Sequence, residues 1–426
     1  MKKTLVSLAT ASLIASTAMA ADKGIDIVTT GQAVVYYETH QTNGNNDNIT
    51  GQNDTEIFDQ QSSNANVGVQ LNLDADLKNN FTFGSQLTYL GTMGLEKNLV
   101  GATKQGGGVT TTSDARDQIA LTKIFIAKKI GNTTVKLGRQ ELPKSLSPFA
   151  FSEGWNVFKN TFDAALVVNT DIPDTTVVGA YVAGGNSSIN IQNIGDLIGG
   201  AVDGTAYMLT VANKSIPMTA ITLSYYDLAQ ISAFTKGDNG VRAMWADVAV
   251  AGKELPMGLK FGLQGGQMNP EEKTFDSTEA LGARVGMSPI EPLSLCLAYT
   301  SVNGSDNKGN LAMKNTGGIK TPLFTQMVYN QDAIALDANT FMVKASYNTG
   351  DYGTITAQYA GTSAGKSNLF NRSGKDTDYG EFDLVYKVKA AGVQYFAAFI
   401  NRSWSEENTA KADSDNRLRV WARYNF

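Results

Sequence analysis

The sequence predicts an all-β chain whose strands run up and down and close into an antiparallel transmembrane barrel. Three observations predict this fold. Apolar and polar residues alternate with a period of two along most of the chain, long polar connections alternate with short turns, and the last strand is amphipathic and ends on an aromatic residue. We expect about 18 strands, with about 16 as the alternative.

The amino terminus predicts export. Lys2 and Lys3 give a positive start, a largely apolar stretch follows, and Ala18-Met19-Ala20 provides an A-x-A cleavage site, so residues 1–20 are expected to be a secretory signal peptide that is removed. Residues 21–426 contain no linker or composition break and are expected to form a single domain. The one cysteine, Cys296, cannot form an internal disulfide.

The strand pattern is clearest in residues 67–74, 81–89, 259–264, 293–300 and 381–389. Successive side chains of a strand point to opposite faces, so each of these segments has one apolar and one polar face. No segment outside the signal peptide approaches the run of roughly 18–20 apolar residues that a membrane helix needs. If the chain spans a membrane, it does so with strands.

The connections alternate in length. Long polar segments fall near 39–61, 93–116, 141–157, 186–202, 231–240, 269–276, 303–336, 363–376 and 405–412, and short turns fall between them. Tight turns on the periplasmic side and long loops outside are typical of a barrel inserted from the periplasm. A soluble sandwich has no reason to sort its loops in this way.

The last strand, NRLRVWARYNF at residues 416–426, has apolar residues at every second position and arginines between them. In a soluble sandwich the apolar face would meet a core. In a membrane barrel it would meet lipid, and the arginines would line a wet interior. The rest of the pattern favours the barrel.

Strand parity then assigns charged side chains to the lumen. The predicted pore-lining residues are Lys136, Asp163, Lys260, Arg284, Lys344, Glu381, Asp383, Lys387, Arg402, Arg417, Arg419 and Arg423. Opposed charges across a narrow wet passage create a field that orients polar solutes. For each residue, an equally good interpretation is a paired wall charge away from the narrowing. Arg139 shares parity with lipid-facing residues, so either a bulge intervenes or the strand has already left the hydrocarbon there.

The carboxyl terminus, with Phe426 last and Tyr424 two residues before it, resembles the assembly signal of outer-membrane barrels. The segments VKLGRQ at 135–140 and TPLFTQMVYNQ at 321–331 resemble the OprD-like porins and the major outer-membrane porins of Campylobacter-type bacteria. The resemblance implies a homotrimer of 18-stranded barrels in the outer membrane of a Gram-negative bacterium. It also implies contacts with lipid, lipopolysaccharide and the assembly machinery.

The third long connection is expected to fold into the lumen and to narrow the pore, as it does in the porins that the chain resembles. Its charged residues are Glu141, Lys144 and Glu153, and Trp155 is one of three aromatic residues, with Phe149 and Phe151, that could anchor it to the barrel wall. The alternative is that these aromatic residues pack under an ordinary outer loop.

Three functions are compatible with this reading: a channel for passive diffusion of small hydrophilic solutes and ions, an OprD-like substrate-specific channel, and a surface adhesin whose barrel presents long loops such as 303–336. The carboxylates near the expected narrowing slightly favour cations. A net charge of −5 argues against nucleic acid as a partner, and the only histidine, His40, has no neighbouring residues that suggest a hydrolase.

No cofactor or metal site is expected. The stretches NGNNDNITGQND at 43–54 and NGSDNKGN at 303–310 carry oxygens that could bind calcium, but solvated loops are the preferred interpretation. The segment GATKQGGGV at 101–109 has no following helix or lysine-serine pair. It is expected to be a mobile outer loop rather than a phosphate cradle.

Overall fold

The computed structural model describes residues 25–43, 55–106, 117–186, 194–195, 205–230, 239–305, 307–370, 374–406 and 412–426. The expected signal peptide, residues 1–20, lies outside them. Within these residues one sheet contains 19 strands. The only other elements that the described residues form are short helices, none of which is long and apolar enough to cross a membrane.

The strands and helices follow one another along the chain without any division into domains. The strands are β1 (Asp26–Asn43), β2 (Ser63–Lys78), β3 (Phe81–Gly91), β4 (Gln118–Ile130), β5 (Thr133–Gln140), β6 (Phe162–Asn169), β7 (Thr175–Asn186), β8 (Ile194–Gly195), β9 (Ala206–Asn213), β10 (Thr219–Leu228), β11 (Val241–Ala251), β12 (Lys260–Pro270), β13 (Thr278–Ile290), β14 (Leu293–Val302), β15 (Ala338–Asn348), β16 (Thr354–Ala364), β17 (Thr377–Ala390), β18 (Val393–Glu406) and β19 (Ala412–Asn425). The helices are η1 (Gln60–Ser62), η2 (Leu95–Lys97), η3 (Pro256–Gly258), α2 (Gln331–Ile334) and η4 (Gly350–Tyr352).

The sheet closes on itself. Each strand pairs antiparallel with its neighbours in sequence, and β1 pairs with β2 on one side and with β19 on the other. The two-residue β8 pairs only with the end of β7, which also pairs directly with β9, so the closed ring has 18 strands. The predicted barrel and its strand number are confirmed. Closure leaves no unpaired sheet edge, which is the condition for a sheet to lie in lipid.

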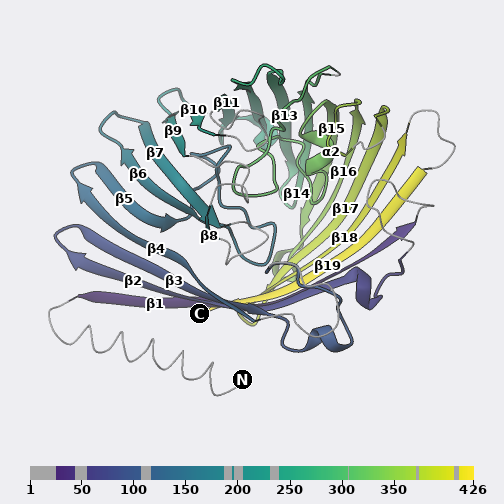
Figure 1. Cartoon of the computed structure of the whole chain (residues 1–426), viewed down its shortest axis with the longest axis horizontal. Coiled ribbons are helices and arrows are strands. Elements are labelled where there is room, and N and C mark those ends of the chain that lie inside the picture. The colour runs from purple at the N-terminus through teal and green to yellow at the C-terminus, as the bar shows by residue number, and fades with distance from the viewer. Residues whose placement is uncertain are drawn as a thin grey trace.

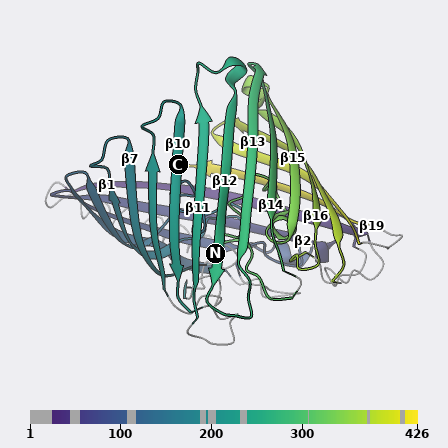
Figure 2. The same cartoon turned by 90° about the horizontal axis from the view of Figure 1, so that it is seen from above.

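The predicted rhythm of the connections is also confirmed. Turns such as 79–80, 131–132 and 391–392 join strands at one end of the barrel, and long segments such as 141–161 and 303–337 join them at the other. Figure 2 shows the strands side by side, with the long connections gathered at one end.

The outer face of the barrel is apolar along its length. Exposed side chains on it include Leu137, Val167, Leu209, Leu223, Met244, Leu263, Leu281, Leu297, Phe341 and Leu384. Their neighbours in each strand point inward, as the period of two predicts. A hydrocarbon environment is therefore the one that this surface fits.

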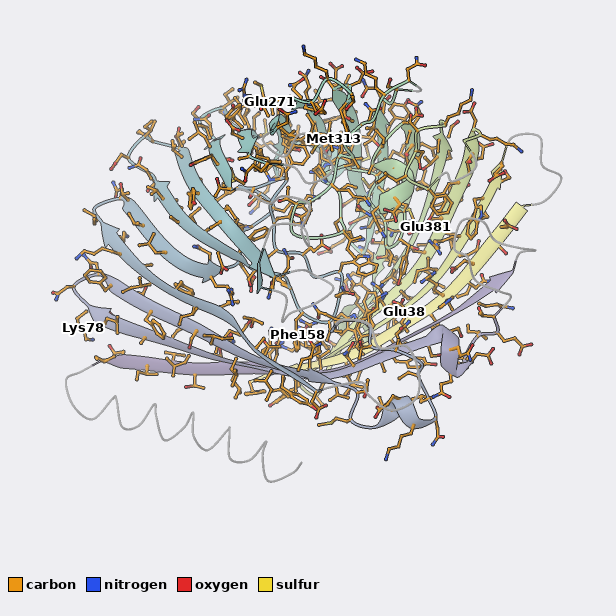
Figure 3. The ribbon with its side chains drawn as sticks, in the orientation of Figure 1. Glu38, Lys78, Phe158, Glu271, Met313 and Glu381 are labelled. Carbon is orange, nitrogen blue, oxygen red and sulfur yellow. The ribbon has the colours of Figure 1, made fainter. Side chains whose placement is uncertain are left out.

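Two long connections fold into the barrel instead of leaving it. They are the 141–161 loop after β5 and the 303–337 loop after β14, and both run inside the curve of the sheet (Figure 1). Phe158 of the first loop and Met313 of the second lie within the curve, whereas Lys78 lies at the edge of the sheet (Figure 3). The inward fold expected for the third long connection is confirmed.

Candidate functional site

The 141–161 loop is anchored to the barrel wall by its aromatic residues. Phe149 makes edge contacts with Tyr226 of β10 and Trp245 of β11, at centroid distances of 5.6 and 5.2 Å. Leu142 and Phe149 share one buried cluster with the wall residues. The aromatic residues thus pack inside the barrel, not under an ordinary outer loop.

The two inward loops are joined by hydrogen bonds. The Glu153 carboxylate accepts bonds from the backbone N–H groups of Ile319 and Lys320, at 2.7 and 2.9 Å, and from Asn315 Nδ2 at 3.0 Å. A Cβ at Gly318 would lie only 2.2 Å from the same carboxylate, so the close approach requires glycine. The two loops therefore form one unit across the interior.

Backbone groups extend this junction towards the 141–161 loop. The Phe149 carbonyl accepts bonds from the Thr316 N–H and hydroxyl, both at 2.7 Å, and the Phe151 N–H donates to Asn315 Oδ1 at 2.8 Å. Lys144 Nζ donates to the Thr321 carbonyl at 3.1 Å. These bonds satisfy polar backbone inside the barrel that water would otherwise have to reach.

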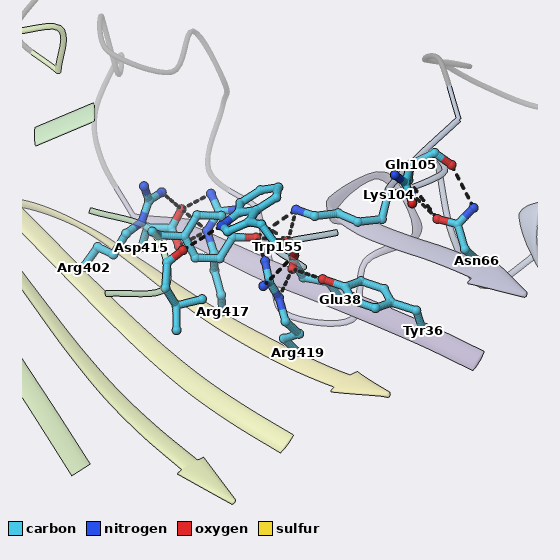
Figure 4. Close-up of polar contacts among 12 residues, drawn as sticks. Tyr36, Glu38, Asn66, Lys104, Gln105, Trp155, Arg402, Asp415, Arg417 and Arg419 are labelled. Atoms are coloured by element: carbon cyan, nitrogen blue, oxygen red, sulfur yellow. Dashed lines mark hydrogen bonds and ion pairs between the residues drawn. The ribbon is translucent and has the colours of Figure 1, made fainter. Parts of the chain in front are cut away.

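Tyr329, at the innermost part of the 303–337 loop, binds the strands where the barrel closes. Its hydroxyl contacts Glu38 of β1 and accepts bonds from Arg419 Nη2 of β19 at 2.7 Å and Lys104 Nζ at 2.9 Å. Its backbone N–H donates to Glu381 of β17 at 2.7 Å. Figure 4 shows the cluster around Glu38, with Trp155 of the 141–161 loop above it.

The arginines of the last strands belong to the same cluster. Arg402 and Arg417 both donate to Asp415, at 2.7 and 2.6 Å, and Arg419 donates to Glu38 at 2.7 Å. Arg423 donates to the Val157 carbonyl at 2.8 Å. These four point inward as predicted, but the loops cover them: the side-chain exposure of Arg419 is 6%. Their predicted place on an open pore wall is corrected to a buried position beneath the loops.

The two predicted acids of β17 are also covered. Glu381 accepts from the Tyr329 N–H at 2.7 Å and the Tyr379 hydroxyl at 2.6 Å. Asp383 accepts from Gln358 Nε2 at 2.7 Å and the Val328 N–H at 3.2 Å. Both carboxylates therefore bind the 303–337 loop to the wall, and neither is free to face a passing solute.

A cavity of about 540 Å³ remains between the two loops and strands β15–β18. Its charged lining is Lys144, Glu153, Lys320, Lys344, Lys387 and Arg419. The one carboxylate of this set, Glu153, is occupied by the backbone of the other loop. The cavity therefore presents mainly positive charge.

Two of these lysines lie on the loops and are buried. Burial lowers the pKa of Lys144 to about 8, although the charge of Asp247 opposes the shift. Burial likewise lowers the pKa of Lys320 to about 8, against the charge of Glu381. Both groups therefore change charge near neutral pH.

The remaining predicted residues lie elsewhere on the inner wall. Lys260 shares the inner register of β12 with Gly262, Arg284 lies over the Phe324 ring at 4.2 Å, and Lys136 lies over the Phe125 ring at 3.6 Å. Glu141 pairs with Lys123 and Lys159, at 2.5 and 2.9 Å. Burial would raise the pKa of Glu141, but the charges of these two lysines lower it.

Asp163 is placed differently from the prediction. It lies opposite Arg139 and binds it through both carboxylate oxygens, at 2.7 and 2.8 Å. Phe162 and Ala164 beside it are buried inside the barrel, so Asp163 and Arg139 face outward. The pair sits where β5 and β6 meet their long connection. This accounts for the lipid-facing parity of Arg139 without a bulge in the pairing of β5.

Sequence reasoning missed five residues of the cluster: Glu38, Lys104, Lys320, Tyr329 and Asp415. Asp415 shares the parity of Arg417, which could have found it. The apolar residues within TPLFTQMVYNQ could have signalled an inward fold, because Leu323 and Met327 are buried. The expectation of a mobile loop fails for residues 101–106, since Gln105 accepts a bond from the Phe158 N–H at 2.8 Å.

The terminal strand completes the ring. Phe426 and Gly31 exchange both backbone hydrogen bonds, at 2.7 and 2.9 Å. Tyr424 stacks on Phe426 at 6.1 Å, and both rings are exposed. Because a Cβ at Gly31 would lie 2.5 Å from the Phe426 ring, glycine leaves the space that this ring fills.

The candidate calcium segment at 303–310 is bound to a neighbouring connection. Asp276 accepts bonds from Ser305 Oγ and Lys308 Nζ, at 2.7 and 2.8 Å. The other candidate, 43–54, lies outside the described residues except for Asn43. In the described part of the chain, no group of three or more His, Cys, Asp or Glu residues could hold a metal.

A closed 18-stranded barrel with an apolar outside and charged, inward-folded loops defines the architecture of a porin. No protein-family model and no curated protein matches the chain. Solved structures do match its fold. Pseudomonas aeruginosa OccK8 (OprE) is 15% identical, with a TM-score of 0.69 over 94% of this chain and 98% of that chain. P. aeruginosa OccK1 (OpdK) is 11% identical, with a TM-score of 0.70 over 94% and 98%.

Acinetobacter baumannii OccAB3 is 12% identical, with a TM-score of 0.68 over 93% of this chain and 99% of that chain. The similar structures are outer-membrane porins of the OprD/Occ type. The likeness supports the OprD-like part of the expected resemblance. The Campylobacter-type part stays a prediction.

Proposed function

We propose that the chain forms a water-filled channel in the outer membrane of a Gram-negative bacterium, through which small hydrophilic solutes and ions diffuse. The observation that carries the proposal is the charged cavity between two inward loops, inside a barrel whose outer face is apolar. A barrel that served only as an anchor would have no use for a polar cavity at its centre. Folds of the same kind occur in OprD/Occ porins.

The charges support a preference for anions at the narrowing. Lys144, Lys344 and Lys387 line the cavity, and the nearby carboxylates Glu153, Glu381 and Asp383 are occupied by the 303–337 loop. This reverses the slight preference for cations that the sequence suggests. The reason is that the sequence shows the carboxylates but not the backbone groups that bind them.

Planar bilayer recording tests the proposal. Purified protein should give stepwise, ohmic conductance, and a salt gradient should give a reversal potential of the sign expected for anions. Liposomes that contain the protein should swell in small sugars. Protein that inserts into the bilayer without conductance, and liposomes that do not swell, would leave only an anchoring role.

The second candidate is a substrate-specific channel. It is favoured by the narrow, charged cavity, because such a site can hold a solute as well as pass it. A conductance block by one solute that saturates with concentration would support it, whereas similar passage of many solutes would support the general channel.

An adhesin is less well supported, because the 303–337 loop, the longest candidate for a binding element, buries Leu323, Met327 and Tyr329 inside the barrel. Export through the periplasm after loss of residues 1–20, recognition of Phe426 and Tyr424 by the assembly machinery, contact with lipopolysaccharide and a homotrimeric state complete the proposal. Native mass spectrometry from detergent tests the last of these, since it should give three times the mass of the mature chain.

A further inference from the structure

The hairpin turns at the end of the barrel with short connections carry exposed apolar side chains. Among the turns that the structure describes there, six of eight have at least one: Ile130, Ile172, Ile216, Met218, Met257, Ile290 and Tyr352, with exposed fractions from 42% to 79%. Turns in water are normally polar, so this repeated feature calls for a partner. We call these seven residues the apolar collar.

Two of the turns are built alike. Residues 169–175, NTDIPDT, and 213–219, NKSIPMT, share the pattern N-x-x-I-P-x-T. In both, the threonine N–H donates to the isoleucine carbonyl, at 3.1 and 3.0 Å, and the threonine hydroxyl contacts the proline carbonyl. The same turn thus presents Ile172 and Ile216 in the same way at two places on the rim.

The residue after the proline marks a difference between these turns. It adopts a left-handed backbone conformation in both, with φ of 55° at Asp174 and 59° at Met218. Met257 has φ of 54° in the next turn along the rim. Asp, Asn and Gly accept this conformation readily, whereas methionine does not. The methionine side chains are therefore present for what they contact, at the expense of backbone preference.

The collar does not run around the whole rim. The two turns without an exposed apolar side chain are 79–80, between β2 and β3, and 391–392, between β17 and β18. They lie on either side of the β1–β19 junction. The collar therefore covers the continuous arc from β4 to β16.

We propose that the collar lies in the interface of the inner-leaflet phospholipids, and that it holds this arc of the barrel in the membrane. The argument is continuity with the lipid-facing surface. Ile130 continues the outward register of Ile124 and Ile126, and Ile290 pairs with Leu293 of the outward register. Tyr386, on the outer face, donates to the Tyr352 carbonyl at 2.7 Å.

The collar thus extends the apolar outside of the barrel by one turn, at the depth where headgroups meet acyl chains. Contacts between neighbouring turns support a common surface, since a Cβ at Gly252 would lie 2.6 Å from Met218 Sδ. The inference rests on the proposed membrane location, but it goes beyond the channel function. It assigns a lipid contact to turns that a channel does not require.

Site-specific fluorescence tests the proposal. In a Cys296→Ser background, single cysteines replace Ile216 or Met257 in the collar, and Asn79 or Ala391 in the two turns outside it. All four positions are exposed. Each variant is labelled with an NBD fluorophore, reconstituted in phosphatidylethanolamine–phosphatidylglycerol vesicles, and assayed for conductance in the same preparation.

Collar probes should show blue-shifted emission, quenching by nitroxide lipids and protection from aqueous iodide, whereas the two control probes should show the opposite. Adding Met218→Asn to the Ile216→Cys variant suits the left-handed backbone and should increase access of iodide to that probe. Conducting protein whose collar probes are as accessible to iodide as the controls would overturn the proposal and indicate a protein partner in the periplasm. Shielded collar probes without conductance would support the collar and count against the channel.

Discussion

Arg419 of the last strand donates a hydrogen bond of 2.7 Å to Glu38 of the first strand, across 381 positions of sequence. The two side chains lie where the ring closes, and both are buried. The Trp155 carbonyl and the Tyr329 hydroxyl bind the same guanidinium. The junction of the barrel and the position of both inward loops therefore depend on one buried ion pair.

Glu38→Gln should destabilise the folded barrel strongly. The substitution leaves the Arg419 charge buried with no carboxylate, and breaking a buried pair in this way costs about 3–5 kcal/mol. Thermal unfolding in detergent, followed by the shift between folded and unfolded bands on a gel, measures the effect.

The control is Arg242→Ala, which breaks the exposed pair with Glu271 on another part of the barrel. Exposed pairs contribute about 0–1 kcal/mol, so this variant should unfold close to the parent temperature. Equal effects of the two substitutions would show that burial of the Glu38 pair has no special role.

Lys344→Glu should change ion selectivity without affecting folding. Lys344 lines the cavity and has no ion pair among the described residues. Reversing a charge next to the passage should shift the anion-to-cation permeability ratio by about two- to five-fold towards cations. The reversal potential in a salt gradient reports it.

Arg417→Gln is the matched comparison. Arg417 is held by Asp415 at 2.6 Å beneath the loop, so its substitution should lower the yield of folded protein more than it changes selectivity. A selectivity change at Arg417 as large as that at Lys344 would contradict the assignment of the passage to the cavity.

Anion preference should fall as the pH rises from 7 to 9. Burial holds the pKa of Lys144 and of Lys320 to about 8, so both are largely charged at pH 7 and largely neutral at pH 9. Reversal potentials at a series of pH values measure the change, and the double variant Lys144→Gln/Lys320→Gln should flatten the curve. The same shift affects stability with the opposite sign. Between pH 8 and about 10.5 the unfolded chain binds more protons, so folding becomes more favourable as the pH rises.

Gly31→Leu should impair barrel closure. The new side chain would overlap the Phe426 ring, 2.5 Å from the position of its Cβ, and the Gln70 carbonyl at 2.7 Å. Overpacking of this kind costs about 1–3 kcal/mol. The fraction of heat-modifiable folded protein in outer-membrane preparations should fall.

Gly179→Ala on β7 is the control, because no atom lies within 4 Å of the position that its Cβ would take. It should assemble like the parent. If Gly31→Leu assembled equally well, the fit between Gly31 and Phe426 would have no part in closure.

The fold could be predicted because membrane barrels write their geometry into local patterns. The alternation in segments such as 293–300 and the spacing of the turns follow directly from strand period and hairpin length. Asp163 shows the limit of the method. Parity must be counted from a reference on each strand, and near a strand end the neighbours Phe162 and Ala164 reveal the inner face only once the loop that packs on them is known.

The charged cluster could not be predicted for a similar reason. Arg417 and Arg419 were assigned to the correct face, but their partners Glu38 and Tyr329 come from the far end of the chain and from another loop. Long-range contacts of this kind have no local signature in one sequence. The 303–337 loop was recognised only by its length, whereas the apolar side chains of Leu323 and Met327 decide where it goes.

The close fit between Glu153 and Gly318 also limits how such a barrel can be re-engineered. Chimeras that exchange the 141–161 segment alone would bring a foreign side chain against a backbone shaped for this carboxylate, and exchanges of 303–337 alone would meet the converse mismatch. Productive transplants should carry both segments together, as a single module inherited from one donor.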